Sequence, residues 1–314
     1  MKKGGAMAQD LNETSGTARG KGRPRVAETA APSLVELLNL IRADDPTTRH
    51  ELERKSELGR AVVARLHAAG AGSIIVPRSA DTDLRDRSAT AELFAETRPD
   101  LVIHLAWEGL PNYTAAFHVD DNLPRHKAFL DNMLKNGLRD LTVTGTCLEY
   151  GMQQGKLQET MEPRPSNAYA IAKNELRKAI GSVAVKENAS FKWVRLFYMY
   201  GKGQNPKSLI SQLDKALENG DTVFNMSGGE QVRDFLPVEK MARYIVAIAD
   251  QQKITGIINC CSGQPVALKD FVTDYLKAKN QHITLNLGYY PYTDYEPMEF
   301  WGDNEKLKSI TSNV

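Results

Sequence analysis

From residue 73 onward, short apolar runs of strand character alternate with longer stretches of helical periodicity. The predicted strands are Ser73–Val76, Leu101–Ala106, Asp140–Gly145, Phe191–Phe197 and Gly256–Cys260. Helices are predicted between and after them, at Ala89–Thr97, Asn122–Asn136, Ala168–Lys186, Ser208–Asn219, Val238–Asp250 and Leu268–Lys279. Strands joined by helices pair in parallel, and the helices cover both faces of the sheet. We therefore expect an α/β fold with a doubly wound parallel sheet.

The composition is that of an ordinary globular protein. At 314 residues, with 41% hydrophobic residues and a net charge of +1, the chain can bury a large core but lacks the bulk charge that binds nucleic acid or membranes. No apolar run approaches the roughly 20 residues that span a bilayer. Cys147, Cys260 and Cys261 form neither a metal-binding nor a disulfide pattern. We expect a cytoplasmic protein without a metal site or membrane anchor.

A tyrosine and a lysine four residues apart, Tyr169 and Lys173, lie on the same face of one predicted helix. The ammonium can sit beside the phenol and favour its ionised form. Thr146, at the end of the preceding strand, would add a hydroxyl and complete an acid/base group for a carbonyl or carbinol. An amphipathic helix with an ordinary surface tyrosine and lysine is the alternative, but the order and spacing of the three residues favour catalysis.

The runs TGTCLEYG at 144–151 and YAIAK at 169–173 resemble the extended branch of the short-chain dehydrogenase/reductases, which holds nucleotide-sugar epimerases, dehydratases and reductases. The resemblance covers about residues 59–314. It implies a Rossmann-like sheet with a small C-terminal substrate lobe, mainly from residues 198–235 and 264–304. It also implies that Tyr169 is the general acid/base at the sugar C4 oxygen, that Lys173 lowers its pKa and holds the nicotinamide ribose, and that Thr146 steadies the substrate oxygen.

Further positions resemble the cofactor site of that branch. Asp83 and Leu84 fit a pair whose carboxylate accepts from the adenine amine, although a polar turn is an equally good interpretation. Leu105 and Ala106 end a strand that lies under the dinucleotide in the family. Arg78 stands where NAD-preferring relatives have an acid, and it could pair with a 2′-phosphate or be an exposed loop cation. We expect NADP or NAD as cofactor, with NADP favoured.

On the substrate side, Arg233 resembles the family arginine that meets the substrate diphosphate, a task that suits a bidentate guanidinium. A surface arginine paired locally with Asp234 is the alternative. Glu149 is a further candidate for substrate contact. His104 is expected to be a core histidine with a hydrogen-bond partner, since neither a carboxylate nor a cysteine stands at metal-ligand spacing.

The glycine loop of the family is missing. Gly59 fits the last glycine of Gly-x-x-Gly-x-x-Gly, but the two earlier ones fall on Ser56 and Glu53, and Pro46–Leu52 does not have the pattern of a buried strand. Those glycines let the backbone approach the cofactor pyrophosphate. We therefore expect a helical N-terminal segment in place of the first strand and its loop, and weaker cofactor binding.

Residues 1–32 are predicted to be a disordered basic tail, and residues 33–58 a helix-turn-helix-like segment. Apolar residues from Leu34 to Ile41 recur at helical spacing, and a third short helix begins near Glu57. Residues 34–66 resemble the helix-turn-helix of ROK-family regulators. Lys21–Arg25 resembles an AT-hook. A solvated tail is the simpler interpretation of that motif, and a recognition helix shared with the sheet domain argues against DNA binding.

The runs His104–Trp107 and Gly145–Gly151 look closest to reductases that act on nucleotide-linked 4-keto-6-deoxy sugars. The predicted function is therefore NAD(P)-dependent reduction of such a hexose at C4. Two alternatives stay open: a nucleotide-sugar 4-epimerase, and a DNA-binding or inactive fusion protein with a relic of the enzyme domain. Members of the family commonly dimerise through two helices each, and the Tyr169 helix would be one of them.

Overall fold

A computed structural model describes residues 36–37, 57–76, 86–202, 204–292, 294 and 296–312 of the chain. Residues Leu34–Val314 belong to one compact unit. The predicted positions Arg78, Asp83 and Leu84 lie outside the described residues, as do the basic tail and the AT-hook-like run. Within the described part of the chain, no helix is long and apolar enough to cross a membrane.

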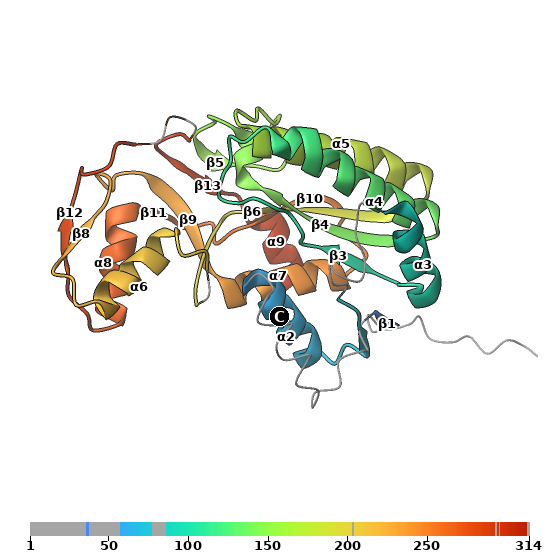
Figure 1. The fold of residues 1–314 in the computed structure, drawn as a ribbon, viewed down its shortest axis with the longest axis horizontal. Coiled ribbons are helices and arrows are strands. Elements are labelled where there is room, and N and C mark those ends of the chain that lie inside the picture. The colour runs from blue at the N-terminus through green and yellow to red at the C-terminus, as the bar shows by residue number, and fades with distance from the viewer. Residues whose placement is uncertain are drawn as a thin grey trace, which may run out of the picture. The chain divides into compact units, whose positions relative to one another are not determined.

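The centre of this unit is a parallel sheet with strand order β10-β6-β4-β3. The bounds of these strands are Gly256–Cys260, Ser190–Leu196, Asp140–Thr146 and Val102–His104. Strand β4 is buried along its whole length and pairs residue by residue with β6, from Asp140 opposite Ser190 to Thr146 opposite Leu196. A central strand covered on both faces has this pattern. The prediction of a doubly wound α/β fold is confirmed (Figure 1).

Two groups of helices cover the two faces of the sheet (Figure 1). One group contains α3 (Arg87–Thr97), α4 (Leu123–Lys135) and α5 (Ala168–Lys186). Its core consists mainly of aliphatic side chains, among them Leu130, Leu134, Leu176 and Ile180. The other group contains α2 (Glu57–Ala68), α7 (Val238–Asp250) and α9 (Glu305–Thr311). It buries Val62, Leu66, Ile245, Ile248 and Leu307.

The C-terminal half also forms a smaller lobe, on the left in Figure 1. Its three-stranded sheet has the order β11-β9-β7, from Pro265–Ala267, Val232–Pro237 and Tyr198–Tyr200. Helices α6 (Leu209–Glu218) and α8 (Leu268–Ala278) pack on β8 (Val223–Asn225) and β12 (Thr284–Asn286) through a separate apolar cluster. Strand β5 (Gly155–Leu157), which comes soon after β4, pairs in parallel with β13 (Phe300–Gly302) from near the C-terminus.

At the N-terminal side, the prediction of a helix from Leu34 to Ile41 is wrong for two residues. Glu36–Leu37 form strand β1, which pairs in parallel with β2 (Ser73–Ile74). This pairing satisfies backbone groups that an unpaired β2 would leave free, and such long-range bonds outweigh a weak helical pattern. The third predicted helix is confirmed as α2, which begins at Glu57 and carries Gly59 in its first turn.

Candidate active site

Helix α5 places Tyr169 and Lys173 on consecutive turns and buries both side chains. The helix begins after Asn167, whose side-chain oxygen accepts a hydrogen bond of 2.9 Å from the backbone N–H of Ala170. This is a standard N-cap, and it sets the helix start at Ala168, one residue before Tyr169. The backbone N–H of Tyr169 donates to the carbonyl of Tyr113 at 3.0 Å. The tyrosine is thus fixed from two sides at the first turn of the helix.

Thr146 is both the last residue of β4 and the N-cap of the short helix η2 (Cys147–Tyr150). Its hydroxyl oxygen accepts from the backbone N–H of Leu148 at 3.2 Å. The same side chain acts on Tyr169 and favours the ionised form of its phenol. The structure therefore brings together Thr146, Tyr169 and, one turn further along α5, Lys173, the three residues predicted to share a site.

The ammonium of Lys173 points toward the sheet. Its Nζ donates to the backbone carbonyl of Thr144 at 2.9 Å and lies 4.2 Å from the ring centre of Trp107. Burial lowers the pKa of Lys173 to about 7, while the Glu149 carboxylate acts in the opposite direction. Near neutral pH the amine therefore exchanges readily between its charged and neutral forms.

Burial raises the pKa of Tyr169, which is the opposite of the direction predicted from a neighbouring lysine. Removal from water disfavours the phenolate, and Tyr113, Glu149 and Cys147 add to this effect. The Thr146 side chain acts the other way and lowers the pKa of Tyr169, but it is the smaller influence. The Lys173 ammonium donates to the Thr144 carbonyl and does not offset this effect of burial. The phenol is thus held protonated, as a proton donor requires.

Trp107, just after β3, is held against this group by a histidine that the sequence did not single out. Its indole N–H donates to Nδ1 of His118 at 3.1 Å, and Nε2 of His118 lies 2.8 Å from the carbonyl of Asn112. Because a carbonyl only accepts, His118 is neutral with its proton on Nε2. Burial also lowers its pKa. The Trp107 ring meets the Tyr169 ring edge-on at 5.9 Å between centres.

His104 is a buried histidine with a hydrogen-bond partner, as predicted. Its Nε2 lies 3.0 Å from Nδ1 of His126, which in turn stacks on Trp107 with ring centres 4.7 Å apart. Burial lowers the pKa of His104 well below its usual value, and that of His126 to about 3. Both rings are therefore neutral. Within the residues that the structure describes, no cluster of His, Cys, Asp or Glu side chains is arranged to hold a metal ion.

Arg233 on β9 is buried, but its partner is not the one that the local alternative proposed. Its Nη2 donates to Glu296 at 3.0 Å, and its Nη1 donates to the carbonyls of Val232 and Met298. Asp234 instead accepts from the backbone N–H groups of Ser262 and Gly263. Local pairing of Arg233 with Asp234 is therefore wrong. In this structure the Glu296 carboxylate is the anion bound by the Arg233 guanidinium.

The other predicted site residues lie in different surroundings. Glu149, a candidate substrate contact, has no exposed surface, and its carboxylate is bonded inward. Leu105 is partly buried, and Ala106 is exposed directly after β3, at the carboxyl edge of the sheet, where parallel sheets bind ligands. Gly59 is partly buried in α2.

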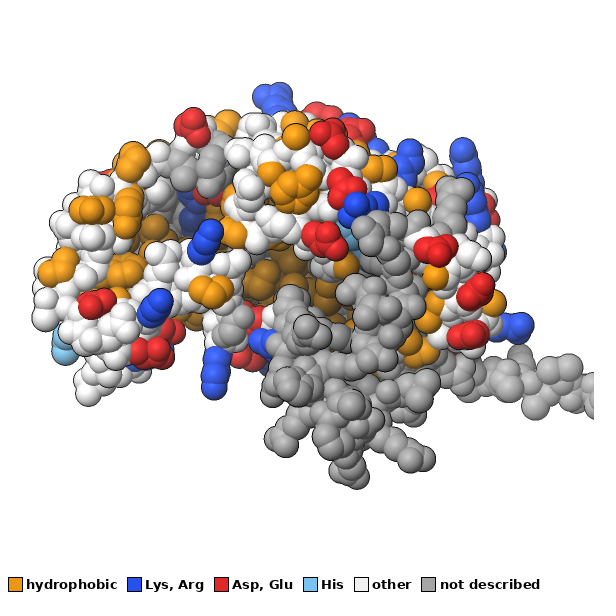
Figure 2. Space-filling model, viewed as in Figure 1, with side chains coloured by type: hydrophobic (Ala, Val, Ile, Leu, Met, Phe, Trp, Pro, Cys, Tyr) orange, Lys and Arg blue, Asp and Glu red, His pale blue; other side chains and the backbone are white. Residues whose placement is uncertain are grey.

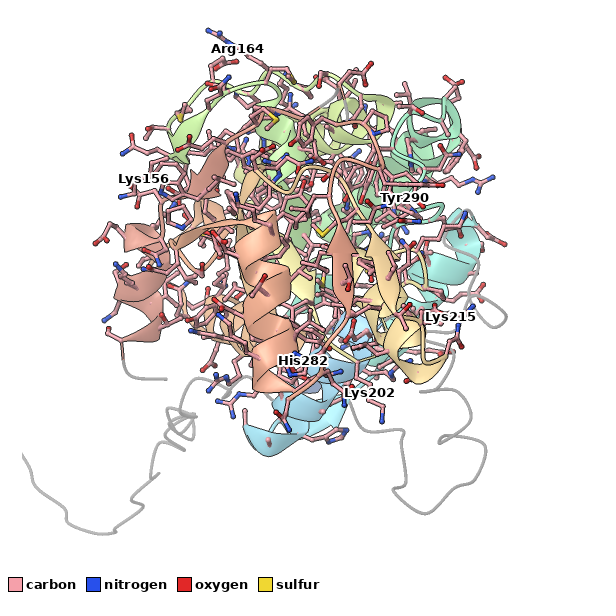
Figure 3. All side chains as sticks on the ribbon, turned by 90° about the vertical axis from the view of Figure 1, so that its left-hand side faces the viewer. Lys156, Arg164, Lys202, Lys215, His282 and Tyr290 are labelled. Atoms are coloured by element: carbon pink, nitrogen blue, oxygen red, sulfur yellow. The ribbon has the colours of Figure 1, made fainter. Side chains whose placement is uncertain are left out.

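This face of the protein is hollowed between the smaller lobe and the sheet, with hydrophobic side chains at the back of the hollow (Figure 2). A separate surface groove of about 700 Å³ lies on the smaller lobe, which faces the viewer in Figure 3. Tyr200, Lys202 and Lys215 are among its lining residues, whereas Thr146, Tyr169 and Lys173 are not. The acid/base group is therefore defined by its side-chain geometry and not by this groove.

The structure thus presents a Rossmann-like parallel sheet with Thr146, Tyr169 and Lys173 buried together at one end of β4. Residues 55–261 match the NAD dependent epimerase/dehydratase family, and the chain belongs to this family. The match begins inside the segment where the glycine loop was expected to be missing.

Two relatives from Aggregatibacter actinomycetemcomitans are similar to the chain. The dTDP-6-deoxy-L-talose 4-dehydrogenase (NAD(+)) is 30% identical over 217 residues, which are 67% of this chain and 80% of that protein. The GDP-6-deoxy-D-talose 4-dehydrogenase is 26% identical over 189 residues, 58% of this chain and 62% of that protein. Among solved structures, a Thermus thermophilus UDP-glucose 4-epimerase in complex with NAD has a TM-score of 0.65 at 19% identity, covering 81% of this chain and 89% of that one. This last likeness establishes the shared fold.

Proposed function

We propose that the protein is an NAD(P)-dependent oxidoreductase that acts at C4 of a nucleotide-linked 6-deoxyhexose and reduces the 4-keto form. The observation that carries the proposal is the placement of Tyr169 and Lys173 on consecutive turns of α5, with Thr146 at the end of β4 and all three side chains buried. The names of the two relatives, both nucleotide-linked 6-deoxytalose 4-dehydrogenases, support chemistry at this carbon. A dehydrogenase and a 4-keto reductase run the same reaction in opposite directions.

In this proposal Tyr169 donates its phenolic proton to the C4 oxygen as the carbonyl becomes an alcohol. Thr146 orients that oxygen through its hydroxyl, and the raised pKa of Tyr169 keeps the proton available until charge develops on the substrate. Bound NADPH or NADH supplies the hydride for C4. Lys173 and the exposed Ala106 would hold the nicotinamide end, and the short alanine side chain leaves room for it. Arg233 would bind the substrate diphosphate once Glu296 gives way.

The first test is binding of NADPH and NADH to the purified full chain, followed by turnover with nucleotide-linked 4-keto-6-deoxyhexoses measured at 340 nm. We expect micromolar cofactor binding, tighter for NADPH, because Arg78 replaces the acid of NAD-preferring relatives. Tyr169→Phe should lower kcat by about 10²- to 10⁴-fold, the usual contribution of a general acid. Exposed Tyr289→Phe is the matched control and should leave kcat unchanged. A folded chain that binds neither cofactor would overturn the proposal.

The same three side chains would also serve 4-epimerisation, in which the hydride is removed and returned on the other face of the sugar. A chain that is purified with bound cofactor, and that converts a nucleotide sugar without net consumption of NADPH, would favour the epimerase. Steady oxidation of added NADPH in proportion to the 4-keto sugar would favour the reductase.

A further inference from the structure

Glu149 is completely buried, and both of its oxygens are hydrogen-bonded inward. Oε1 accepts from the backbone N–H of Thr146 at 2.9 Å and from the indole N–H of Trp193 at 2.9 Å. Oε2 accepts from Nε of Arg195 at 2.9 Å and lies 3.9 Å from Nε of Arg177. A buried carboxylate is tolerated only when it is paired and hydrogen-bonded in this way.

The partners of Glu149 come from the elements that carry the proposed acid/base group. Thr146 ends β4, and Trp193 and Arg195 lie on the neighbouring strand β6. Arg177 lies on α5 at the same four-residue spacing after Lys173 that separates Lys173 from Tyr169. The three side chains therefore share one face of α5. The Glu149 carboxylate connects the end of β4 with the helix that presents the tyrosine and the lysine.

Gly145 leaves the space that this arrangement needs. A Cβ atom at residue 145 would overlap Nε1 of Trp193 and lie 2.5 Å from Oε1 of Glu149. Because Gly145 has no side chain, the Glu149 carboxylate can lie against the end of β4 and reach Trp193. The family-like run from Gly145 to Glu149 thus contains both Thr146 and the carboxylate that binds the backbone N–H of Thr146.

Glu149 also supplies the negative charge that acts on Lys173. The imidazoles of His104, His118 and His126 face the ammonium, and burial lowers the pKa of each, so they contribute no charge near neutral pH. The Glu149 carboxylate favours the charged form of Lys173 against the effect of burial. The same negative charge disfavours the phenolate of Tyr169. It therefore favours the protonated form of both groups.

We propose that Glu149 is a positioning residue of the active site, which ties the backbone of Thr146 to β6 and α5 and places a negative charge beside Lys173 and Tyr169, without touching the substrate. This inference rests on the proposed function for the roles of Thr146, Lys173 and Tyr169. It assigns Glu149 a role different from the substrate contact that the sequence suggested. Its contacts with Thr146, Trp193 and Arg195 are those that such a role requires.

The test compares Glu149→Gln, which keeps the shape and removes the charge, with Arg177→Gln, which removes a cation from the same group. Titration of Lys173 by 13Cε NMR reads its pKa without turnover, and the signal is assigned by its loss in Lys173→Met. Glu149→Gln should shift the Lys173 titration downward by about one pH unit or more, because an attractive charge is lost. Arg177→Gln should shift it upward, because a like charge is lost. The pH profile of kcat should move in the same directions.

Lys178→Gln is the matched control, because Lys178 follows Arg177 on α5 but pairs with Glu175 at the surface. Its titration curve should coincide with that of the original chain. If Glu149→Gln does not fold, the more exposed Arg177→Gln decides the outcome. A folded variant of either kind with an unshifted Lys173 titration would overturn the inference. Absence of turnover in the original chain, with the Lys173 shifts intact, would instead count against the proposed function alone.

Discussion

The Arg195–Glu149 pair and the Arg233–Glu296 pair place the same two side chains in different settings. Arg195 and Glu149 are both fully buried, on β6 and η2, with a shortest distance of 2.9 Å. Arg233 lies on β9, but Glu296 belongs to the segment before β13 and keeps 13% of its side chain exposed. Their distance is 3.0 Å.

The two ion pairs differ in burial, and we therefore expect them to differ in role. The fully buried Arg195–Glu149 pair stabilises the fold, whereas a ligand could replace Glu296 as the partner of Arg233. Opening the first pair would leave buried charges unpaired inside the core, which is expensive. In the second, the carboxylate comes from a partly exposed segment, so an anionic ligand could take its place with little loss.

Arg195→Met should destabilise the protein by about 3–5 kcal/mol, since it leaves the Glu149 charge buried without its principal partner. The measurement is the free energy of unfolding in urea. Lys178→Met, on the surface of α5, is the control and should change the stability by less than about 0.5 kcal/mol. A loss below about 1 kcal/mol for Arg195→Met would show that the Arg195–Glu149 pair contributes little to the stability of the fold.

Arg233→Met should raise KM for the nucleotide sugar by about ten- to a hundredfold, while kcat falls much less. The guanidinium is proposed to bind a part of the substrate that does not react, and a lost charged hydrogen bond has about this magnitude. Steady-state kinetics of the full chain provide the measurement. Lys202→Met removes a cation from the same lobe and should leave KM close to its original value. An equal fall in kcat and kcat/KM would place Arg233 at the reacting carbon instead.

Glu296→Gln should lower KM by about three- to tenfold, because the carboxylate no longer competes with the substrate diphosphate for Arg233. The matched control is Glu299→Gln, an exposed glutamate of the same segment, which should leave KM unchanged. Increased KM in the Glu296 variant would show that this carboxylate supports the substrate and does not exclude it.

Glu57 is a third glutamate to compare with Glu149 and Glu296. Its buried Oε1 has no hydrogen-bond partner among the described atoms. Burial, with Glu239 adding, raises its pKa from 4.5 to about 7. The folded state thus binds this proton more tightly than the unfolded state does, and stability falls as the pH rises from about 4.5 to about 7. Glu57→Gln should therefore stabilise the chain at pH 8 by about 1 kcal/mol or less, after allowance for solvent screening, and by almost nothing at pH 4.5. Thermal unfolding at both values checks this, with exposed Glu92→Gln as control.

Much of the fold could be predicted from local patterns. The bounds of α5, α7 and β10 agree with the predicted ranges residue for residue. For α5, the Asn167 cap is a local signal that marks the start. The four-residue spacing of Tyr169 and Lys173 likewise needs no tertiary information. Strand β1 was not predicted, because its two residues pair with a strand that lies 37 positions further along the chain, as the register of Glu36 with Ser73 shows.

By itself, the sequence determined which side chains are available for proton transfer and on which elements they lie: Thr146 at a strand end, Tyr169 and Lys173 on one helix face. Only the tertiary structure decided their chemistry. Burial raised the pKa of Tyr169. The folded chain also placed Glu149 beside Arg195, 46 residues away in the sequence, and Glu296 beside Arg233. The physical reason is that periodicity and capping act within a few residues, whereas desolvation and ion pairing depend on what packs around a group after the chain has folded.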